Sequence, residues 1–387
     1  MTERQINEKL KRIELSPLTG LPLVSVLVSS YNYGRYLEEA ILSVCTQAYS
    51  KLEILVCDDG STDDSWQIIL RLGRQDPRII PLRQPNSGQA AALNRAYEAS
   101  SGDVVCLLDA DDLFYPKKVE SVVAALSSSE KCGMAIHRMD RVDAARRTLG
   151  VIPLLYELPR GWQPDHYNLL APQMLPGLPP CSGLSLRRTL ADRLFPLPVG
   201  LRAYADTLIQ VVAPMLTSIA AIDDVLSAYR IHGENTAGRK RYSPRDVEKL
   251  INYEHEIWSA WRFHIQSILG SVALAELPPL TRPPSVLDYA NARFHDAPHY
   301  KGIYRKVISL PAFRSLPLPH RWAWGISILL PNALFRRFVS FVYGQGVEKD
   351  LIGRLLRIHR TVRRWFFRMV PLRITRYRAA SPDPSDR

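Results

Sequence analysis

Residues 103–112 read DVVCLLDADD, an apolar run typical of a buried strand that ends directly in acidic residues. Residues 52–59 repeat the arrangement as LEILVCDD. Near-continuous apolar runs of this length predict strands of a parallel sheet that is covered on both faces. Ligands of such sheets bind beyond the carboxyl ends of the strands. We therefore expect the acidic clusters Asp58-Asp59 and Asp109–Asp112 to lie along one binding edge.

Strand-like and helix-like segments alternate on both sides of these runs. Strands are expected at 23–29, 52–57, 78–82, 103–108, 133–137, 182–186 and 219–229. Helices are expected at 34–48, 63–72, 89–99, 116–126, 203–216 and 244–267, with 268–300 as a linker. The alternation predicts an α/β fold, a Rossmann-like domain with a mostly parallel central sheet, followed by a helical C-terminal region.

The net charge of +12 is concentrated near the C-terminus. Residues 301–387 hold 18 Lys and Arg against 4 Asp and Glu, whereas the rest of the chain holds 32 against 34. An asymmetry of this kind favours an anionic partner for the basic region.

The tail also has helical periodicity. An apolar stripe on one side faces arginines on the other, which is typical of a helix on an anionic membrane surface. The stripe consists of Leu351, Leu355, Ile358, Val362, Trp365 and Met369. Docking of this helix on the protein itself or on another subunit is the alternative. No nucleic-acid partner is expected, because basic charge alone is not a binding motif.

The remaining composition favours a cytoplasmic protein, and the tail helix favours a peripheral position on the inner face of the cell membrane. The five cysteines are odd in number and form no CxxC pair, as expected for small buried side chains in a reducing compartment. The first residues carry charges and no apolar core, unlike a signal peptide. No apolar run reaches the roughly 20 residues that a spanning helix needs.

Three carboxylates at Asp109, Asp111 and Asp112 repel one another unless a cation neutralises them. Mg²⁺ and Mn²⁺ prefer oxygen ligands, and they combine one or two carboxylates with substrate phosphates. A metal-bridged diphosphate is a good leaving group. Capping of a following helix could explain Asp111 or Asp112, but not all three residues.

The cluster at Asp58-Asp59 continues as Gly60-Ser61-Thr62-Asp63. Gly60 permits a tight turn, and one of the three residues after it can cap the next helix. Asp58 and Asp59 remain as acceptors for a base amide or for ribose hydroxyls.

Four segments of the sequence, in the same order along the chain, resemble those of a known family. They read PLVSVLVSSYNYGRYLEEAILSVCTQAYSKLEILVCDDGSTDDS (22–65), NSGQAAALNRAYEASSGDVVCLLDADD (86–112), PPCSGLSLRR (179–188) and YRIHGENTAG (229–238). This series resembles the family 2 glycosyltransferases, which have the GT-A fold. The resemblance divides the chain into an extension (1–20), a catalytic domain (21–240), a helical segment with linker (241–300) and a basic amphipathic helical region (301–387).

The resemblance implies roles for the matched residues. Those expected on the nucleotide-sugar donor are Ser30, Tyr31, Asp58, Asp59, Asn86, Gly88, Asn94, Asp109 and Ala110. Those expected on Mn²⁺ or Mg²⁺ are Asp109, Asp111 and His232.

The resemblance also implies a late carboxylate as general base. In the family it usually follows a glutamate, and here Asp206 follows Ala205. Asp206 opens an expected helix, so capping is the alternative role. As the base, it would take the proton of an acceptor hydroxyl that attacks the anomeric carbon, and this single displacement inverts that carbon.

The implied function is transfer of a sugar, from UDP as the family's commonest nucleotide, to a saccharide or lipid-linked acceptor. Surface polysaccharide or glycoconjugate synthesis is the expected setting. The QxxRW motif of processive synthases is missing, which indicates non-processive transfer. The alternatives are a sugar-phosphate nucleotidyltransferase, whose glycine-rich phosphate loop is not found after the first strand, and a non-catalytic membrane-associated scaffold.

Overall fold

The structure, a computed structural model, describes residues 13–152, 157–164, 177–233, 235, 243–275, 285–310, 313 and 318–343. The described residues all belong to one compact unit. The amphipathic helix expected at 351–370 lies outside the described residues.

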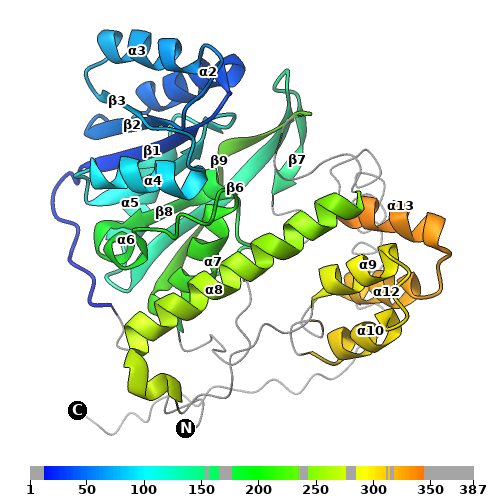
Figure 1. Ribbon diagram of the computed structural model, residues 1–387. Helices are drawn as coiled ribbons and strands as arrows, with labels where there is room; N and C mark the ends of the chain where they lie inside the picture. The colour runs from blue at the N-terminus through cyan, green and yellow to red at the C-terminus, as the bar shows by residue number, and fades with distance from the viewer. Residues whose placement is uncertain are drawn as a thin grey trace, which may run out of the picture. The chain divides into compact units, whose positions relative to one another are not determined.

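A nine-stranded mixed sheet forms the centre of the fold (Figure 1). Its strands are β1 (Val24–Ser30), β2 (Leu52–Asp58), β3 (Ile79–Arg83), β4 (Val104–Asp109), β5 (Leu113–Phe114), β6 (Cys132–Asp143), β7 (Thr148–Ile152), β8 (Leu184–Arg187) and β9 (Ser218–Ile231). The order is β3-β2-β1-β4-β8-β6-β9-β5, and β7 pairs with β6. Strands β8, β5 and β7 run opposite to the other six. The predicted mostly parallel sheet is confirmed, although β7 and the length of β6 were not expected.

The strand register brings the two acidic clusters to the same edge. Ser30 at the end of β1 is opposite Asp58 of β2, and Ser29 is opposite Asp109 of β4. Because these strands are parallel, both acidic clusters leave the sheet at its carboxyl end. The prediction of a common edge is therefore confirmed.

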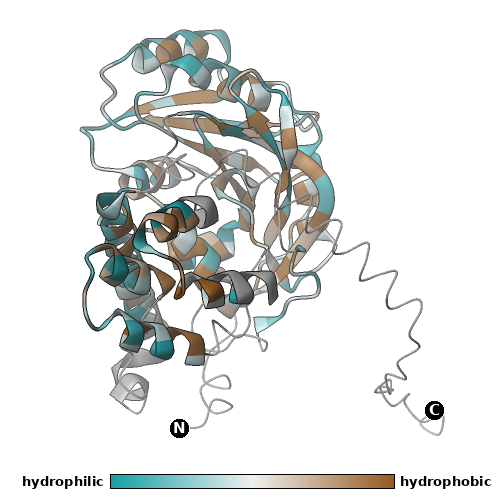
Figure 2. Cartoon of the chain, turned by 90° about the vertical axis from the view of Figure 1, so that its right-hand side faces the viewer, coloured by the Kyte–Doolittle hydropathy of each residue, from teal (hydrophilic) through white to brown (hydrophobic). Residues whose placement is uncertain are grey.

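Helices cover both faces of the sheet. They are α2 (Gly34–Cys45), α3 (Ser65–Gln75), α4 (Gln89–Glu98), α5 (Lys118–Ser127), α6 (Arg188–Leu194) and α7 (Ala205–Leu216), with a short 3₁₀ turn η2 (Cys181–Gly183). Alternate residues of each strand point to opposite faces, so Val26 and Val28 pack with α2, α3 and α5 while Leu27 packs with α4, α6 and α7. Figure 2 shows the resulting strands as mostly hydrophobic.

The C-terminal part of the described chain is helical and has its own core. Its helices are α8 (Pro244–Ala275), α9 (Val286–Phe294), α10 (Tyr300–Ser309), α12 (Leu318–Ser327) and α13 (Asn332–Tyr343). Helix α8 contributes Trp261 to the core of the sheet domain and Val247 to the core of the helical region. None of the helices in these described ranges is both long and apolar enough to cross a membrane.

The expectation of a linker over 268–300 is wrong in two places. Helix α8 continues to Ala275, and α9 occupies Val286–Phe294. Helix α9 begins with a capping box, in which the Ser285 hydroxyl accepts from the backbone N–H of Asp288 and the Asp288 carboxylate accepts from the N–H of Ser285. This Ser-x-x-Asp signal was readable in the sequence as a helix start.

Candidate functional site

The turn after β4 begins the site. Asp109 is the last residue of β4, and its backbone N–H donates to the Ser182 hydroxyl (3.0 Å). Its carboxylate accepts from the Gln89 side-chain amide at the start of α4 (3.1 Å). Asp109 therefore lies where β4, α4 and the turn η2 meet.

Asp112 has a structural role in the same turn. One of its carboxylate oxygens accepts from the Ser182 hydroxyl (2.7 Å), and the other accepts from the backbone N–H of Arg230 in β9 (2.9 Å). The side chain is fully buried, and burial, with the nearby charges of Asp111 and Asp109, raises its pKa well above the usual range. Asp112 therefore joins η2 to β9 and has no oxygen left for a ligand.

Asp111 is paired with the segment that follows β9. His232 Nε2 lies 2.9 Å from Asp111 Oδ2, and the Asn235 amide donates to the same oxygen (3.3 Å). Asn235 is held in turn, because its amide donates to the carbonyl of Arg230 and its oxygen accepts from the backbone N–H of His232. The structure therefore brings together two of the three expected metal ligands, which are 121 residues apart in the sequence.

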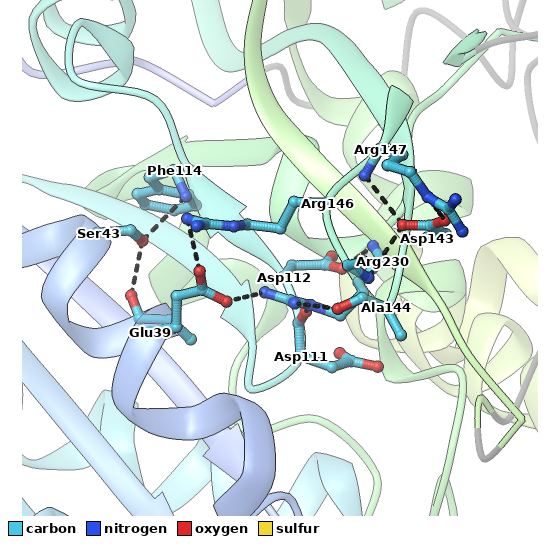
Figure 3. A network of polar contacts seen from close by, with 12 residues as sticks. Glu39, Ser43, Asp111, Asp112, Phe114, Asp143, Ala144, Arg146, Arg147 and Arg230 are labelled. Carbon is cyan, nitrogen blue, oxygen red and sulfur yellow. Dashed lines mark hydrogen bonds and ion pairs between the residues drawn. The ribbon is translucent and has the colours of Figure 1, made fainter. Parts of the chain in front are cut away.

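The side chain of Arg230 holds the turn after β4 in place (Figure 3). Only 2% of its side chain is exposed, and its Nε donates to the backbone carbonyl of Asp111 (2.8 Å). Its other nitrogens reach the carbonyl of Ala144 (3.3 Å) and the Glu39 carboxylate of α2 (2.5 Å). One guanidinium thus connects the acidic turn, the β6–β7 turn and α2, and it also lies over the ring of Tyr36.

Helix α2 contacts the site at two further points. The rings of Tyr36 and Tyr33 lie against His232, with centroid distances of 4.7 and 5.8 Å. Glu39 also forms an ion pair with Arg146 of the β6–β7 turn (2.7 Å). The carboxylate of Glu39 is therefore shared by one buried and one exposed arginine, as Figure 3 shows.

Asp206 lies in the first turn of α7. The capping position of α7 is Tyr204, in a left-handed conformation (φ 59°), so Asp206 does not occupy it, although its carboxylate interacts with backbone N–H groups at the helix start. The backbone N–H of Ala205 donates to the Gln89 side-chain oxygen (3.1 Å). Because the amide of Gln89 donates to Asp109, this one side chain links the start of α7 to the end of β4.

The carboxyl groups of Asp109 and Asp206 interact electrostatically. Burial raises the pKa of Asp109 to about 8, and the charges of Asp111 and Asp206 contribute to the increase. Burial also raises the pKa of Asp206 to about 6, against backbone N–H groups of Thr207 and Cys181 that lower it. A cluster of this kind favours a bound cation and provides a carboxylate whose pKa is close to neutral.

Asp58 and Ser30 keep unpaired atoms at the neighbouring strand ends. Asp58 Oδ2 accepts from the backbone N–H of Ser61 (3.2 Å) and pairs with Arg83 (3.1 Å), but its Oδ1 is buried without a partner. The hydroxyl of Ser30, opposite Asp58 in the sheet, is also buried and unpaired. Buried polar atoms of this kind are usually satisfied by a ligand or by water.

Asp59, by contrast, is fully occupied by the loop that precedes α4. Its carboxylate accepts from the backbone N–H groups of Ser87 (2.8 Å) and Gly88 (2.7 Å) and from the amide of Gln84 (2.8 Å). Gly60 (φ 75°) forms the expected tight turn, since a side chain there would lie 2.7 Å from the backbone nitrogen of Asn86. Asp59 and Gly60 therefore shape this loop.

The five other expected donor residues occupy different environments. Gly88 (φ 95°) lies so close to Arg202 that a Cβ would be 2.6 Å from its Cα. Asn94 exchanges two hydrogen bonds with the backbone of Leu197, so its side chain is fully used within the fold. Asn86 accepts from the Arg202 guanidinium, Tyr31 is 45% exposed, and Ala110 is buried in the core.

The residues fit a divalent cation only in part. Among the described residues, no group of three His, Cys, Asp or Glu side chains is arranged to hold a metal ion. Asp111 and His232 alone are close enough to share one. A pair of protein ligands suits Mg²⁺ or Mn²⁺, which complete their coordination with substrate phosphates and water.

Five residues of the site were not among the expected ones. They are Glu39, Gln89, Ser182, Arg230 and Asn235. All five lie inside the matched blocks, but their roles depend on contacts with distant segments. Glu39 carries no local signal, because a charged residue on an amphipathic helix is ordinarily solvated.

Comparison with known proteins gives matches over the sheet domain. The glycosyl transferase family 2 model matches residues 25–191. An uncharacterized glycosyltransferase of Nostoc sp. is 37% identical over 227 residues, 55% of this chain and 66% of that protein. The hyaluronan synthase of Pasteurella multocida is 36% identical over 115 residues, 30% of this chain and 12% of that protein. The chain thus matches no more than 66% of either relative's length.

Two solved structures are also similar. Staphylococcus aureus TarS, residues 1–349 in complex with UDP-GlcNAc, gives a TM-score of 0.47 at 16% identity, over 82% of this chain and 90% of that chain. The mannosyltransferase PcManGT from Pyrobaculum calidifontis, in complex with GDP-Man and Mn²⁺, gives 0.45 at 18% identity, over 92% of both chains.

Proposed function

Because this chain belongs to the family 2 glycosyltransferases, we propose that it transfers a sugar from a nucleoside diphosphate sugar to an acceptor hydroxyl. The reaction is a metal-assisted, inverting and non-processive transfer. The observation that carries the proposal is the meeting of three segments at one sheet edge. The Asp111–His232 pair, Asp109 and Asp206 come from the ends of β4 and β9 and the start of α7.

The nucleoside is assigned to the end of β1 and β2. Asp58 Oδ1 and the Ser30 hydroxyl are the buried polar atoms there without partners, so a base amide or a ribose hydroxyl would satisfy them. The half-exposed ring of Tyr31 follows Ser30 directly. Asp59, Asn86 and Gly88 act indirectly, by shaping the loop before α4. UDP is the expected nucleotide from the family resemblance.

The diphosphate is assigned to the turn after β4. Asp111 and His232 would hold Mn²⁺ or Mg²⁺, and Asp109, whose pKa the charge of Asp111 helps to raise, would contact the ribose. An ion held there would supply positive charge to stabilise the leaving diphosphate. Asp112 and Arg230 keep Asp111 in place, and Asn235 orients both Asp111 and His232.

The general base is assigned to Asp206. As the acceptor oxygen bonds to the anomeric carbon, the bond from that carbon to the diphosphate breaks and the hydroxyl proton passes to the Asp206 carboxylate. A pKa near 6 leaves this group mostly ionised at neutral pH and still basic enough to accept a proton. Since the acceptor attacks opposite the leaving group, the configuration at the anomeric carbon inverts.

The acceptor is a saccharide or a lipid-linked saccharide, in surface polysaccharide or glycoconjugate synthesis at the inner face of the cell membrane. This assignment rests on the basic region 301–387 and on the amphipathic pattern at 351–370. Arginines opposite an apolar stripe suit an anionic lipid surface.

A thermal-shift panel tests the donor assignment. UDP-, GDP- and TDP-sugars are compared with and without Mn²⁺, and we expect one nucleotide to raise the melting temperature only when the metal is present. Release of that nucleoside diphosphate should accompany turnover. A non-catalytic scaffold would give binding without turnover, and a nucleotidyltransferase would release pyrophosphate from a nucleoside triphosphate and a sugar phosphate.

Asp111→Asn provides the matched test of the metal. The substitution retains the size of the side chain and removes the charge, so Mn²⁺-dependent stabilisation should disappear while the metal-free melting temperature stays nearly constant. Asp223→Asn, in an exposed ion pair with Arg160, is the control and should bind normally. Undiminished Mn²⁺ dependence in Asp111→Asn would remove the metal assignment.

A further inference from the structure

The turn between α12 and α13 presents apolar side chains to solvent. Helix α12 ends at Ser327 and α13 begins at Asn332 (both orange in Figure 1). Leu329 at the turn is 80% exposed, and Ile326 and Leu334 on either side are 53% and 48% exposed. Leu329 is the most exposed of the large apolar residues in the described part of the chain.

The same two helices bury other apolar residues thoroughly. Trp324, Phe335 and Val339 are at most 2% exposed, in the core that α12 and α13 share with α9. The inner apolar side of both helices is therefore buried in this core. The apolar side chains at the turn form a second group, which the described residues leave exposed. Uncovered apolar groups of this kind mark sites of interaction.

Arg293 of α9 gives the turn a fixed shape. Its guanidinium donates to the backbone carbonyl of Ser327, the last residue of α12, and to that of Leu330 in the turn. It also contacts the Asn332 side chain (3.4 Å) and lies 4.3 Å from the ring centre of Phe335. Arg293 is itself 5% exposed. The exposed apolar side chains therefore lie on a turn whose backbone is fixed by hydrogen bonds from a buried arginine.

The chain segment that contains the turn is strongly basic, and one exposed carboxylate from outside it, Asp296, accepts from the Asn332 side chain at the start of α13. Residues 301–343 contain seven Lys and Arg and no Asp or Glu. The exposed ones within the helices are Lys301, Arg305 and Lys306 of α10 and Arg336 and Arg337 of α13. Arg336 and Arg337 lie within one helical turn of Leu334. Apolar side chains beside cations complement a lipid surface with anionic headgroups.

We propose that the α12–α13 turn is a membrane-binding element, which inserts Leu329, with Ile326 and Leu334 beside it, among the acyl chains of an anionic bilayer. Arg336 and Arg337 contact the lipid phosphates. The basic segment 345–387 is an unsuitable cover for the turn, because both are positively charged. The element is distinct from the tail helix and does not depend on the transfer reaction.

Vesicle binding of the full chain tests the proposal. Sedimentation with phosphatidylcholine vesicles, with and without phosphatidylglycerol, measures the partition coefficient. Leu329→Glu should lower binding to the anionic vesicles by roughly tenfold or more, since a side chain of leucine size is worth that factor when it leaves water. Leu21→Glu, a change of the same kind at a residue 53% exposed elsewhere, should leave binding unchanged.

A label at the turn separates this element from tail-driven binding. Leu329→Cys is combined with Cys45→Ser and Cys132→Ser, the two half-buried cysteines, and carries an environment-sensitive dye. The dye emission should shift to the blue on anionic vesicles and be quenched by acyl-chain quenchers. An unchanged emission in vesicle-bound protein would overturn the proposal. A blue shift that depends on protein concentration without lipid would also overturn it, because it would indicate a second copy at the turn.

Nucleoside diphosphate release in solution gives an independent readout. Leu329→Glu should keep the melting temperature and the turnover of the parent chain, because Leu329 is 80% exposed and is not one of the residues assigned to the reaction. Loss of vesicle binding with intact turnover supports the membrane element even if the nature of the donor is revised. Unchanged vesicle binding by Leu329→Glu contradicts it, whatever the turnover.

Discussion

Aspartates at this sheet edge carry out different tasks because their hydrogen-bond partners differ. Asp112 and Asp59 use both carboxylate oxygens within the protein. Asp58 keeps one oxygen unpaired, Asp111 is paired with His232, and Asp206 has a pKa near 6. The surroundings of each carboxylate therefore decide whether it maintains the fold or is available to a ligand.

The pKa of Asp206 predicts the acidic limb of the pH profile. Only the ionised carboxylate accepts a proton, so kcat/KM for donor turnover should fall about tenfold per pH unit below a pKa of about 6 and level off above it. Asp206→Asn should lose roughly 100-fold or more in kcat, retain donor affinity, and no longer show this limb. A variant that keeps both rate and limb would exclude Asp206 as the base.

Substitution by asparagine should affect mainly nucleotide binding at Asp58 and mainly stability at Asp59. Asp58→Asn should weaken nucleotide binding by roughly tenfold, the value of one hydrogen bond to a charged group, with a small change in stability. Asp59→Asn weakens three hydrogen bonds of the loop before α4 and should lower unfolding free energy by about 2 kcal/mol. Calorimetric titration and urea unfolding measure the two effects. Equal effects of both changes on both quantities would contradict this division.

The sequence indicates where the carboxylates gather but not how each is used. Apolar runs that end in acids predict the sheet edge, because strand polarity alone determines it. The division within each cluster depends on partners such as Ser182 for Asp112, 70 residues away, and no local pattern carries that information. Asp59 was expected to contact the nucleoside as readily as Asp58, and only the loop at 84–88 distinguishes them.

At the scale of elements, α2 and β9 together brace the turn after β4. Arg230 of β9 holds the carbonyl of Asp111, and Glu39 of α2 holds Arg230. Tyr36 of α2 lies against His232. Two elements that are far apart in the sequence therefore set the positions of both proposed metal ligands.

Arg230→Lys should weaken Mn²⁺ binding, because one ammonium group cannot reproduce the bonds of the guanidinium to Asp111, Ala144 and Glu39. Outer contacts of this kind typically change metal affinity by roughly 10- to 100-fold. Electron paramagnetic resonance of Mn²⁺ with UDP present measures the affinity directly, without turnover.

Arg147→Lys is the matched control for this brace. Arg147 lies in the neighbouring turn, but its side chain is 82% exposed and forms an ion pair with Asp143. Its replacement should leave Mn²⁺ affinity within about twofold, since exposed pairs contribute little. If both variants weaken Mn²⁺ binding equally, the brace is not the cause.

Prediction of the elements from the sequence succeeded where periodicity is strong. The expected strand at 52–57 and helix at 89–99 match β2 and α4 closely. Helix α9 was expected as linker because the prolines before it obscured its capping signal at Ser285. Strand β7 is exposed along most of its length and so has little apolar alternation to detect.

At the scale of the whole molecule, charge separates the two ends of the chain. Segment 345–387 holds 11 Lys and Arg against 4 Asp and Glu, a surplus of seven out of the net +12. The sheet domain needs none of this charge for the proposed chemistry. The surplus is therefore expected to determine where the protein is found rather than what it transfers.

Removal of residues 345–387 should reduce binding to anionic vesicles by at least tenfold and make the remainder less sensitive to salt. Each cation near a charged surface contributes about 1 kcal/mol at low ionic strength. Sedimentation across a salt series measures this dependence, with nucleoside diphosphate release as the control for folding. Identical salt dependence with and without the segment would exclude it as a membrane contact.

The two bonds of Asp112 have a consequence for the order of events during turnover. They hold the turn after β4 in shape before any ligand arrives, so an incoming ion need not fold the turn. Asp111 and His232 are the two protein side chains that would hold such an ion, so the phosphates of the donor and water would complete its coordination. We therefore expect the protein to bind Mn²⁺ weakly without the donor and more firmly with it, so that the rate depends on the Mn²⁺ concentration in solution.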